Sequence, residues 1–123
     1  MRVSREEFEA LVEQALEQLP DEFKQALDNV AVMVEEEPED EDLEEVGIDP
    51  ADPDRDELFG LYQGVPLTER DSFYTALPDR VLIYRGPILR ECDTRRQVIR
   101  EIRETVQHEL GHYFGMEEDE LPF

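Results

Sequence analysis

Residues 108–115 read His108-Glu109-Leu110-Gly111-His112-Tyr113-Phe114-Gly115, and this stretch predicts both a helix and a metal site. Its first five residues follow the pattern H-E-x-x-H. Because the histidines are four positions apart, both imidazoles lie on one face of a helix, about one turn from each other. Two neutral imidazole nitrogens placed in this way bind a single zinc ion at about 2.0–2.1 Å each. We therefore expect His108 and His112 to be metal ligands.

The helix that carries these residues has recognisable ends. Thr94 and Gln97 form a T-x-x-Q capping box at its start, and Gly115 is suited to a left-handed C-cap at its end. Between them, apolar residues recur at helical spacing and form one core-facing stripe: Ile99, Ile102, Val106, Leu110 and Tyr113. The two histidines project beside this stripe.

Glu109 follows the first histidine directly, so it is placed to act as a general base towards a water at the metal. A third ligand would come from the acids that follow Gly115, which are Glu117, Glu118, Asp119 and Glu120. A left-handed glycine allows the chain to reverse towards the histidines. Three protein ligands leave the fourth zinc position open for water, which is typical of a catalytic site.

Upstream, the pattern predicts two N-terminal helices and three short strands. Ser4 and Glu7 form a capping box for a helix that runs to Pro20, and Asp21 begins a second, shorter helix. Short runs rich in β-branched and aromatic residues predict strands at Val30–Val34, Leu58–Gly64 and Val81–Tyr84. The first and last are continuous apolar runs, so we expect both of their faces to be covered. The middle one is thinned by glycine and followed by Pro66, which blocks an interior strand, so we expect it at an edge.

The composition limits the classes of partner. With 34 acidic and 12 basic residues the net charge is −22, which disfavours nucleic acid and anionic membranes as partners. The 123 residues predict a single domain, 1–123, and a monomer by default. A loop at about 35–57 holds fourteen acids and one arginine, so we expect it to be long and solvated. The charged N-terminus predicts a cytoplasmic protein, and the lone Cys92 predicts no internal disulfide.

The stretch 108–115 resembles the signature of the small bacterial zincin-like metallopeptidase family, a minimal form of the zincin fold. Two upstream blocks, residues 60–70 and 78–88, are similar to further blocks of that family in the same order. The resemblance implies an α+β fold in which a small mixed sheet of about three strands packs on the C-terminal active-site helix. It also implies that the acid ten residues after the first histidine, Glu118, is the third ligand, with Asp119 as the alternative.

These observations predict a zinc-dependent metallopeptidase with one Zn²⁺ per chain, held by His108, His112 and Glu118, and with Glu109 as general base. Its partner would be a peptide or protein substrate. The alternative is a catalytically silent module that keeps the zincin fold and binds metal or another protein. A small domain with shallow walls is compatible with that alternative, because catalysis favours a walled, dry cleft.

Overall fold

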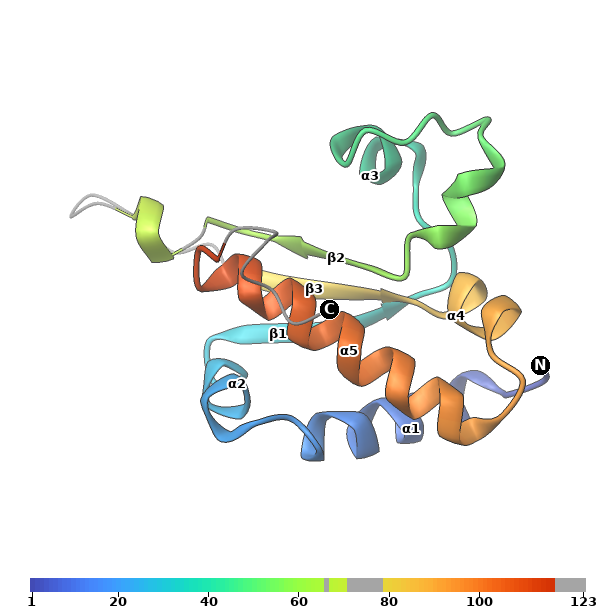
Figure 1. The fold of residues 1–123 in the computed structure, drawn as a ribbon, viewed down its shortest axis with the longest axis horizontal. Coiled ribbons are helices and arrows are strands. Elements are labelled where there is room, and N and C mark those ends of the chain that lie inside the picture. The colour runs from blue at the N-terminus through green and yellow to red at the C-terminus, as the bar shows by residue number, and fades with distance from the viewer. Residues whose placement is uncertain (66, 71–78, 117–123) are drawn as a thin grey trace.

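The computed structural model describes residues 1–65, 67–70 and 79–116. Its helices are α1 (Arg5–Glu17), α2 (Asp21–Ala26), α3 (Asp40–Glu45), α4 (Arg85–Glu91) and α5 (Arg95–Tyr113). Its strands are β1 (Val30–Glu35), β2 (Gly60–Gln63) and β3 (Asp79–Tyr84), and single 3₁₀ turns lie at Pro53–Glu57 and Leu67–Glu69. Figure 1 shows the long helix α5 crossing one side of the sheet, with α1 beside it.

The three strands form one mixed sheet with the order β1-β3-β2. β1 pairs with β3 in parallel, from Val30 opposite Asp79 to Glu35 opposite Tyr84. β2 pairs with β3 in antiparallel fashion, from Gly60 opposite Ile83 to Gln63 opposite Arg80. The predicted α+β fold, with a small mixed sheet on the C-terminal helix, is therefore confirmed, and β2 lies at an edge as expected.

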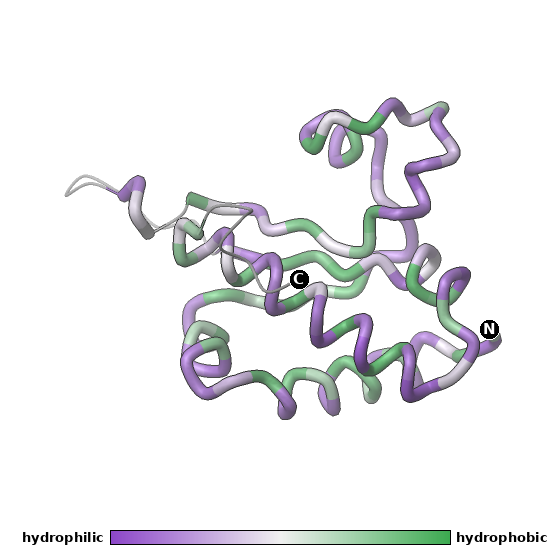
Figure 2. Tube along the Cα trace, in the orientation of Figure 1, coloured by the Kyte–Doolittle hydropathy of each residue, from purple (hydrophilic) through white to green (hydrophobic). Residues whose placement is uncertain are grey.

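One hydrophobic core joins α1, α5 and the near face of the sheet. Phe8 from α1, Val81 and Ile83 from β3, and Ile102 and Val106 from α5 are all fully buried within it. Burying a side chain of this size contributes about 1.5–3 kcal/mol relative to leaving it exposed. Figure 2 shows the hydrophobic residues concentrated in the strands and along the helices that face them. This core fixes α5 against the sheet and so determines where its histidines lie.

The opposite face of the sheet carries α3, which lies inside the acidic stretch that we expected to be a loop. Leu43 of α3 is fully buried. Asp42 accepts hydrogen bonds from the Tyr84 hydroxyl at 3.0 Å and from the Gln63 side chain at 3.2 Å. A single buried leucine and one bridging carboxylate thus order a segment whose composition alone favours solvent.

Two further expectations are wrong. β1 is not covered on both faces, because it is an edge strand on which Ala31, Met33 and Glu35 are not buried and Met33 is 40% exposed. Its continuous apolar run reflects β propensity rather than burial. Gly86 and Pro87 also predict a turn that closes β3, but the chain enters α4 directly after the strand. Pro87 is the third residue of α4. The N–H groups of a first helical turn have no partner within the helix, so a proline, which lacks an N–H, is compatible with the helix there.

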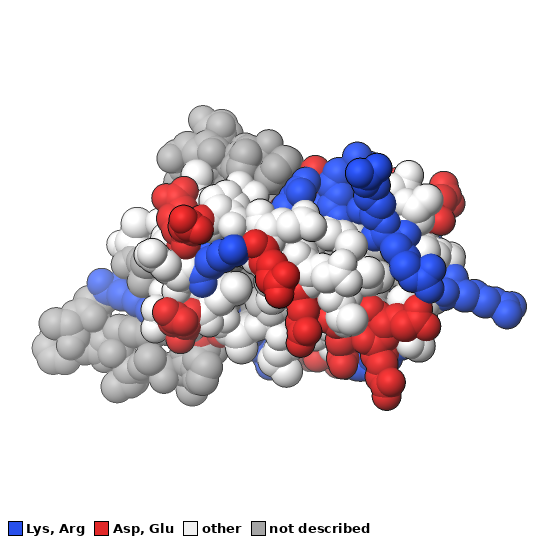
Figure 3. Space-filling model, turned by 90° about the horizontal axis from the view of Figure 1, so that it is seen from below, with Lys and Arg blue, Asp and Glu red and all other residues white. Residues whose placement is uncertain are grey.

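Charges on the surface are not evenly mixed. In Figure 3 most of the Lys and Arg side chains gather towards one end of the face, whereas acidic side chains lie at several places on it. Arg96, Arg100 and Arg103 of α5 lie around one shallow cleft together with Gln18. Elsewhere Glu36 pairs with Arg5 and Arg85, which ties the start of the acidic stretch to the body of the protein. Among the described helices, none has the length and apolar character needed to cross a membrane.

Candidate metal centre

Helix α5, which carries both histidines, is positioned by its cap and its core stripe. Thr94 accepts a hydrogen bond from the Gln97 amide, and the Gln97 side chain accepts one from the Thr94 amide, so the predicted capping box is complete. Leu110 and Gly111 are buried, whereas His108 and His112 on the adjacent face are only partly buried. The helix ends at Tyr113, and Gly115 takes the expected left-handed conformation with φ of 81°.

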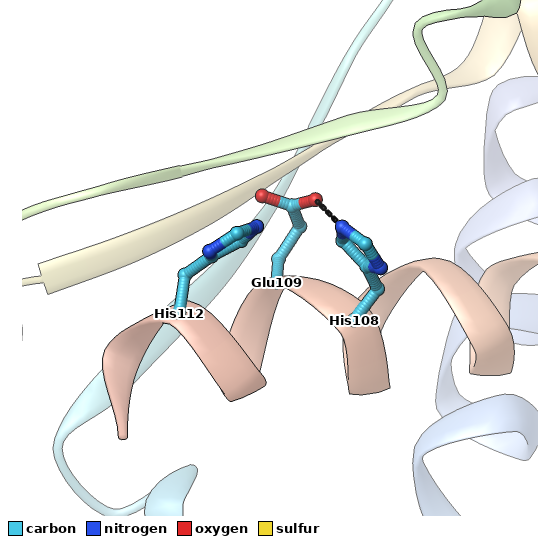
Figure 4. A group of neighbouring side chains, drawn as sticks. All are labelled: His108, Glu109 and His112. Atoms are coloured by element: carbon cyan, nitrogen blue, oxygen red, sulfur yellow. Dashed lines mark ion pairs between the residues drawn. The ribbon is translucent and has the colours of Figure 1, made fainter. Parts of the chain in front are cut away.

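His108, Glu109 and His112 project from one side of α5 towards β2, and the carboxylate lies between the two imidazoles (Figure 4). The ring centroids of the histidines are 5.0 Å apart. His108 Nε2 lies 3.9 Å from Glu109 Oε2. One potential ligand atom from each residue lies within 4.8 Å of the other two. The helix therefore brings together the three residues that the sequence singled out.

Glu109 is oriented by the backbone of the neighbouring strand. The Tyr62 amide donates a hydrogen bond of 2.9 Å to Glu109 Oε1, so this N–H of β2 points away from β3 and towards α5. Gly60 makes the close approach possible. A Cβ at Gly60 would lie 2.5 Å from Thr105 Cγ2 and 2.8 Å from the Leu82 carbonyl oxygen. The absence of a side chain at residue 60 therefore allows β2 to reach the carboxylate.

A cleft of about 600 Å³ opens along the free edge of β2 and exposes the three residues. Its floor is formed by β2 and by the histidine-bearing turn of α5, and its rim by Glu45 and Val46 at the end of α3. Val46 is 42% exposed, although it is apolar. The cleft thus places an extended, partly apolar surface next to the candidate ligands.

A second cleft, of about 370 Å³, adjoins the first and shares His108 and Glu109 with it. Glu57, Glu101 and Glu104 line it, and none of the three takes part in an ion pair within the part of the chain that the structure describes. Burial, followed by repulsion from Glu104 and Glu91, raises the pKa of Glu101 above its ordinary value. This side of the centre therefore has a negative potential.

The remaining predicted site residues fall outside the group. Glu118 and Asp119 lie outside the described residues. From the sequence, Tyr62, Tyr84 and Tyr113 are the candidate donors to an oxyanion. Two of them already have acceptors, because the Tyr62 hydroxyl donates to Asp79 at 2.9 Å and the Tyr84 hydroxyl to Asp42. Tyr84 is also on the face of the sheet that carries α3, away from the histidines. Tyr113, the third of these tyrosines, is buried, with 4% of its surface exposed.

Sequence reasoning missed two features of the site. One is the Tyr62 amide, because a backbone donor leaves no trace in side-chain identity; the glycine at residue 60 was the available signal of a close approach. The other is Asp79, because the dipeptide Pro78-Asp79 predicts a turn before β3 and not a buried strand residue. It is the first residue of β3 and is 2% exposed.

The donor set fits a divalent metal ion. Two imidazoles on successive turns of one helix, with a carboxylate between them, match the ligand preferences of zinc, which binds nitrogen and oxygen ligands at about 2.0–2.2 Å. Together with the partial burial of these side chains, this favours a metal centre over two unrelated surface histidines. The chemistry available to such a centre is hydrolysis assisted by a metal ion.

Comparisons with known proteins agree with the geometry. The model of a family described as zincin-like metallopeptidases matches residues 27–122. Among solved structures, a conserved hypothetical protein from T. thermophilus is similar, with a TM-score of 0.55 and 28% sequence identity. The alignment covers 91% of this chain and 94% of that one. No curated protein gives a significant match.

Proposed function

This chain belongs to the zincin-like metallopeptidase family, and on that premise we propose that it is a zinc-dependent peptidase that hydrolyses peptide bonds with Glu109 as general base. The observation that carries the proposal is the convergence of His108, Glu109 and His112 at the floor of a cleft along the free edge of β2. Membership of the family implies a metal ion, but the reaction also needs a base and a place for the substrate. Glu109 would be the base, and the cleft that it lines would hold the substrate.

His108 and His112 would hold one zinc ion per chain, and Glu118, or Asp119 beside it, would complete the ligand set after the Gly115 turn. When bound, the ion supplies Lewis acidity, which lowers the pKa of a water ligand towards about 7 and polarises the carbonyl of the scissile bond.

Glu109 would move the protons. Its Oε1 is held by the Tyr62 amide, so the carboxylate is kept in one orientation between the imidazoles. Oε2 would take a proton from the attacking water as the water oxygen bonds to the carbonyl carbon. The same carboxyl group would then give that proton to the leaving amine nitrogen as the C–N bond breaks. A fixed orientation saves the entropy of ordering the base in the transition state.

The substrate would lie extended along β2. Backbone groups at a free strand edge pair with an added strand, and pockets beside the edge accept alternate side chains. The Tyr62 amide at that edge is bonded to Glu109, so the substrate would pair with other backbone groups of the edge. The apolar rim at Val46 and Leu58 would contact one substrate side chain, while the acidic cleft lies on the His108 side of the centre.

Glu109→Gln tests the proposal because it removes the base and keeps the shape of the side chain. We expect peptide cleavage to fall by about 10²–10⁴-fold, with zinc content unchanged. Cleavage would be followed by mass spectrometry on a mixture of peptides, and zinc by plasma mass spectrometry. The matched control is Glu13→Gln, which makes the same charge change at an exposed position of α1.

Zinc content also separates the peptidase from a silent binding module. Wild-type protein should carry about one zinc per chain, and His112→Ala should lose it. If the wild type binds zinc but cleaves nothing, and Glu109→Gln behaves like the wild type, the peptidase proposal is wrong and the binding module takes its place.

A further inference from the structure

A buried ion pair lies beside the site, outside the residues that would hold metal or move protons. Asp79, at the start of β3, is 2% exposed and pairs with the Arg70 guanidinium, whose side chain is 22% exposed. The same carboxylate accepts a hydrogen bond of 2.9 Å from the Tyr62 hydroxyl. Burying two charges is costly, and replacing such a pair with apolar residues is often neutral or stabilising.

Tyr62 connects Asp79 to the base. Its side chain ends at Asp79, and its backbone amide, 2.9 Å from Glu109 Oε1, orients the carboxylate. Burial, then the hydrogen bond to Asp79, raises the pKa of Tyr62, so the hydroxyl remains a donor at all physiological pH values. Gly64, two residues further along, approaches Asp79 so closely that a Cβ there would lie 2.5 Å from Asp79 Cγ. Asp79 therefore sets the position of the second half of β2 and of the residues directly after the strand.

Arg70 connects Asp79 to the end of α5. Its Nε donates to the Val65 carbonyl at 2.8 Å and so closes the segment between β2 and residue 70. Thr68 of that segment packs directly on Gly115, where a Cβ would overlap the Thr68 side chain. The guanidinium also lies over the Tyr113 ring, 5.5 Å from its centroid, next to His112. Arg70 thus supports the turn from which the chain leaves the histidine-bearing helix.

We propose that Asp79 is a positioning residue of the metal centre, which orients Glu109 through the Tyr62 amide and supports the Gly115 turn through Arg70 and Thr68. The role in turnover rests on the proposed function. The coupling itself concerns only residues of this chain, and it has a readout that requires neither metal nor substrate.

The readout is the amide proton of residue 62 in a ¹H–¹⁵N correlation spectrum. A hydrogen bond to a carboxylate is strong, and it moves the donor proton downfield. Tyr62→Phe removes only the hydroxyl bonded to Asp79, and Asp79→Asn keeps both the shape and the tyrosine at residue 62. In both variants we expect the residue-62 amide proton to move upfield. If it does not move in either variant, Asp79 does not orient Glu109.

Tyr84→Phe is the matched control. It also removes a buried tyrosine hydroxyl that donates to a carboxylate, Asp42 at 3.0 Å, but on the opposite face of the sheet. The residue-62 amide should be unchanged in this variant. An equal shift in Tyr84→Phe would mean that any lost hydroxyl loosens the sheet, and the specific role of Asp79 would be rejected.

Asp79 acts through two branches, one through Tyr62 to Glu109 and one through Arg70 to the Gly115 turn. Measurements of metal binding and of turnover distinguish these two branches. Tyr62→Phe leaves the Arg70 branch intact, so kcat should fall about tenfold while KM and zinc affinity stay within about twofold of wild type. Asp79→Asn affects both branches, so zinc affinity should also fall about tenfold. A loss of zinc affinity in Tyr62→Phe equal to that in Asp79→Asn would refute the two-branch arrangement. If no variant, wild type included, cleaves peptides, the proposed function fails while the amide shifts still decide the coupling.

Discussion

Gly60→Ala should damage both the stability of the protein and the orientation of its base. The new methyl group would lie 2.5 Å from Thr105 Cγ2 and 2.8 Å from the Leu82 carbonyl oxygen. Carbon atoms in contact are normally about 3.5–4.0 Å apart, so β2 must withdraw from α5 by about 1 Å. That movement would stretch the 2.9 Å hydrogen bond between the Tyr62 amide and Glu109 well beyond bonding distance.

This displacement sets the size of both the loss of stability and the loss of rate. Forcing an extra methyl group into a packed interior costs about 1–3 kcal/mol, which urea unfolding followed by circular dichroism would measure. A misplacement of about 1 Å in an active site costs about 10²-fold in rate, which the peptide cleavage assay would measure. Zinc content should be unchanged, because both histidines lie on α5 and the substitution does not touch them.

The double variant that combines Gly60→Ala with Thr105→Ser provides the control, because the serine lacks the methyl group that the new Cβ would meet. In the double variant the clash with the Leu82 carbonyl remains, so we expect only partial recovery of stability and of rate. If Gly60→Ala alone unfolds at the wild-type urea concentration and cleaves at the wild-type rate, β2 does not approach α5 as closely as described, and Glu109 must be oriented by other contacts.

Two further predictions concern stability. Gly115→Ala forces alanine into a left-handed conformation against Thr68, and should destabilise by about 1–3 kcal/mol in urea unfolding, more than Gly47→Ala, where φ is also 81° but the space is open. Glu101→Gln should be stabilising at pH 7, by about 0.2–0.5 kcal/mol from the relieved repulsion with Glu104. Because burial raises the pKa of Glu101 above 4.5, the folded state holds this proton more tightly, so wild-type stability falls as pH rises above that value. The gain should therefore vanish below about pH 4.5, and an equal gain at about pH 3 would contradict this assignment.

The chemistry-bearing helix was predictable because its signals are local. The capping box at Thr94, the glycine at 115 and the apolar stripe all lie within one helix, and each agrees with the others. The spacing of His108 and His112 then places their rings together by helical geometry alone, without knowledge of any other element. The three strands were predictable for the same reason, since each is a short run of apolar residues.

The features that could not be predicted depend on contacts between distant segments. The order of α3 comes from Leu43 and from Asp42, which meets Gln63 and Tyr84 only in the folded chain. The burial of β1 depends on its place at the sheet edge, which its β-branched run does not encode. Asp79 follows a proline and resembles a turn residue until β3 pairs with both neighbours. These are tertiary effects that override local propensity.

The donor that orients Glu109 belongs to the main chain, and this affects what related sequences are able to record. Every amino acid except proline supplies an amide at residue 62, so a substitution there keeps the donor even where, as in Tyr62→Phe, it weakens the contact. An alignment of relatives would therefore record the side-chain contact with Asp79 at this column, and not the amide that reaches Glu109. The inherited constraint falls instead on Gly60, whose missing side chain allows the approach, and on the exclusion of proline two residues later.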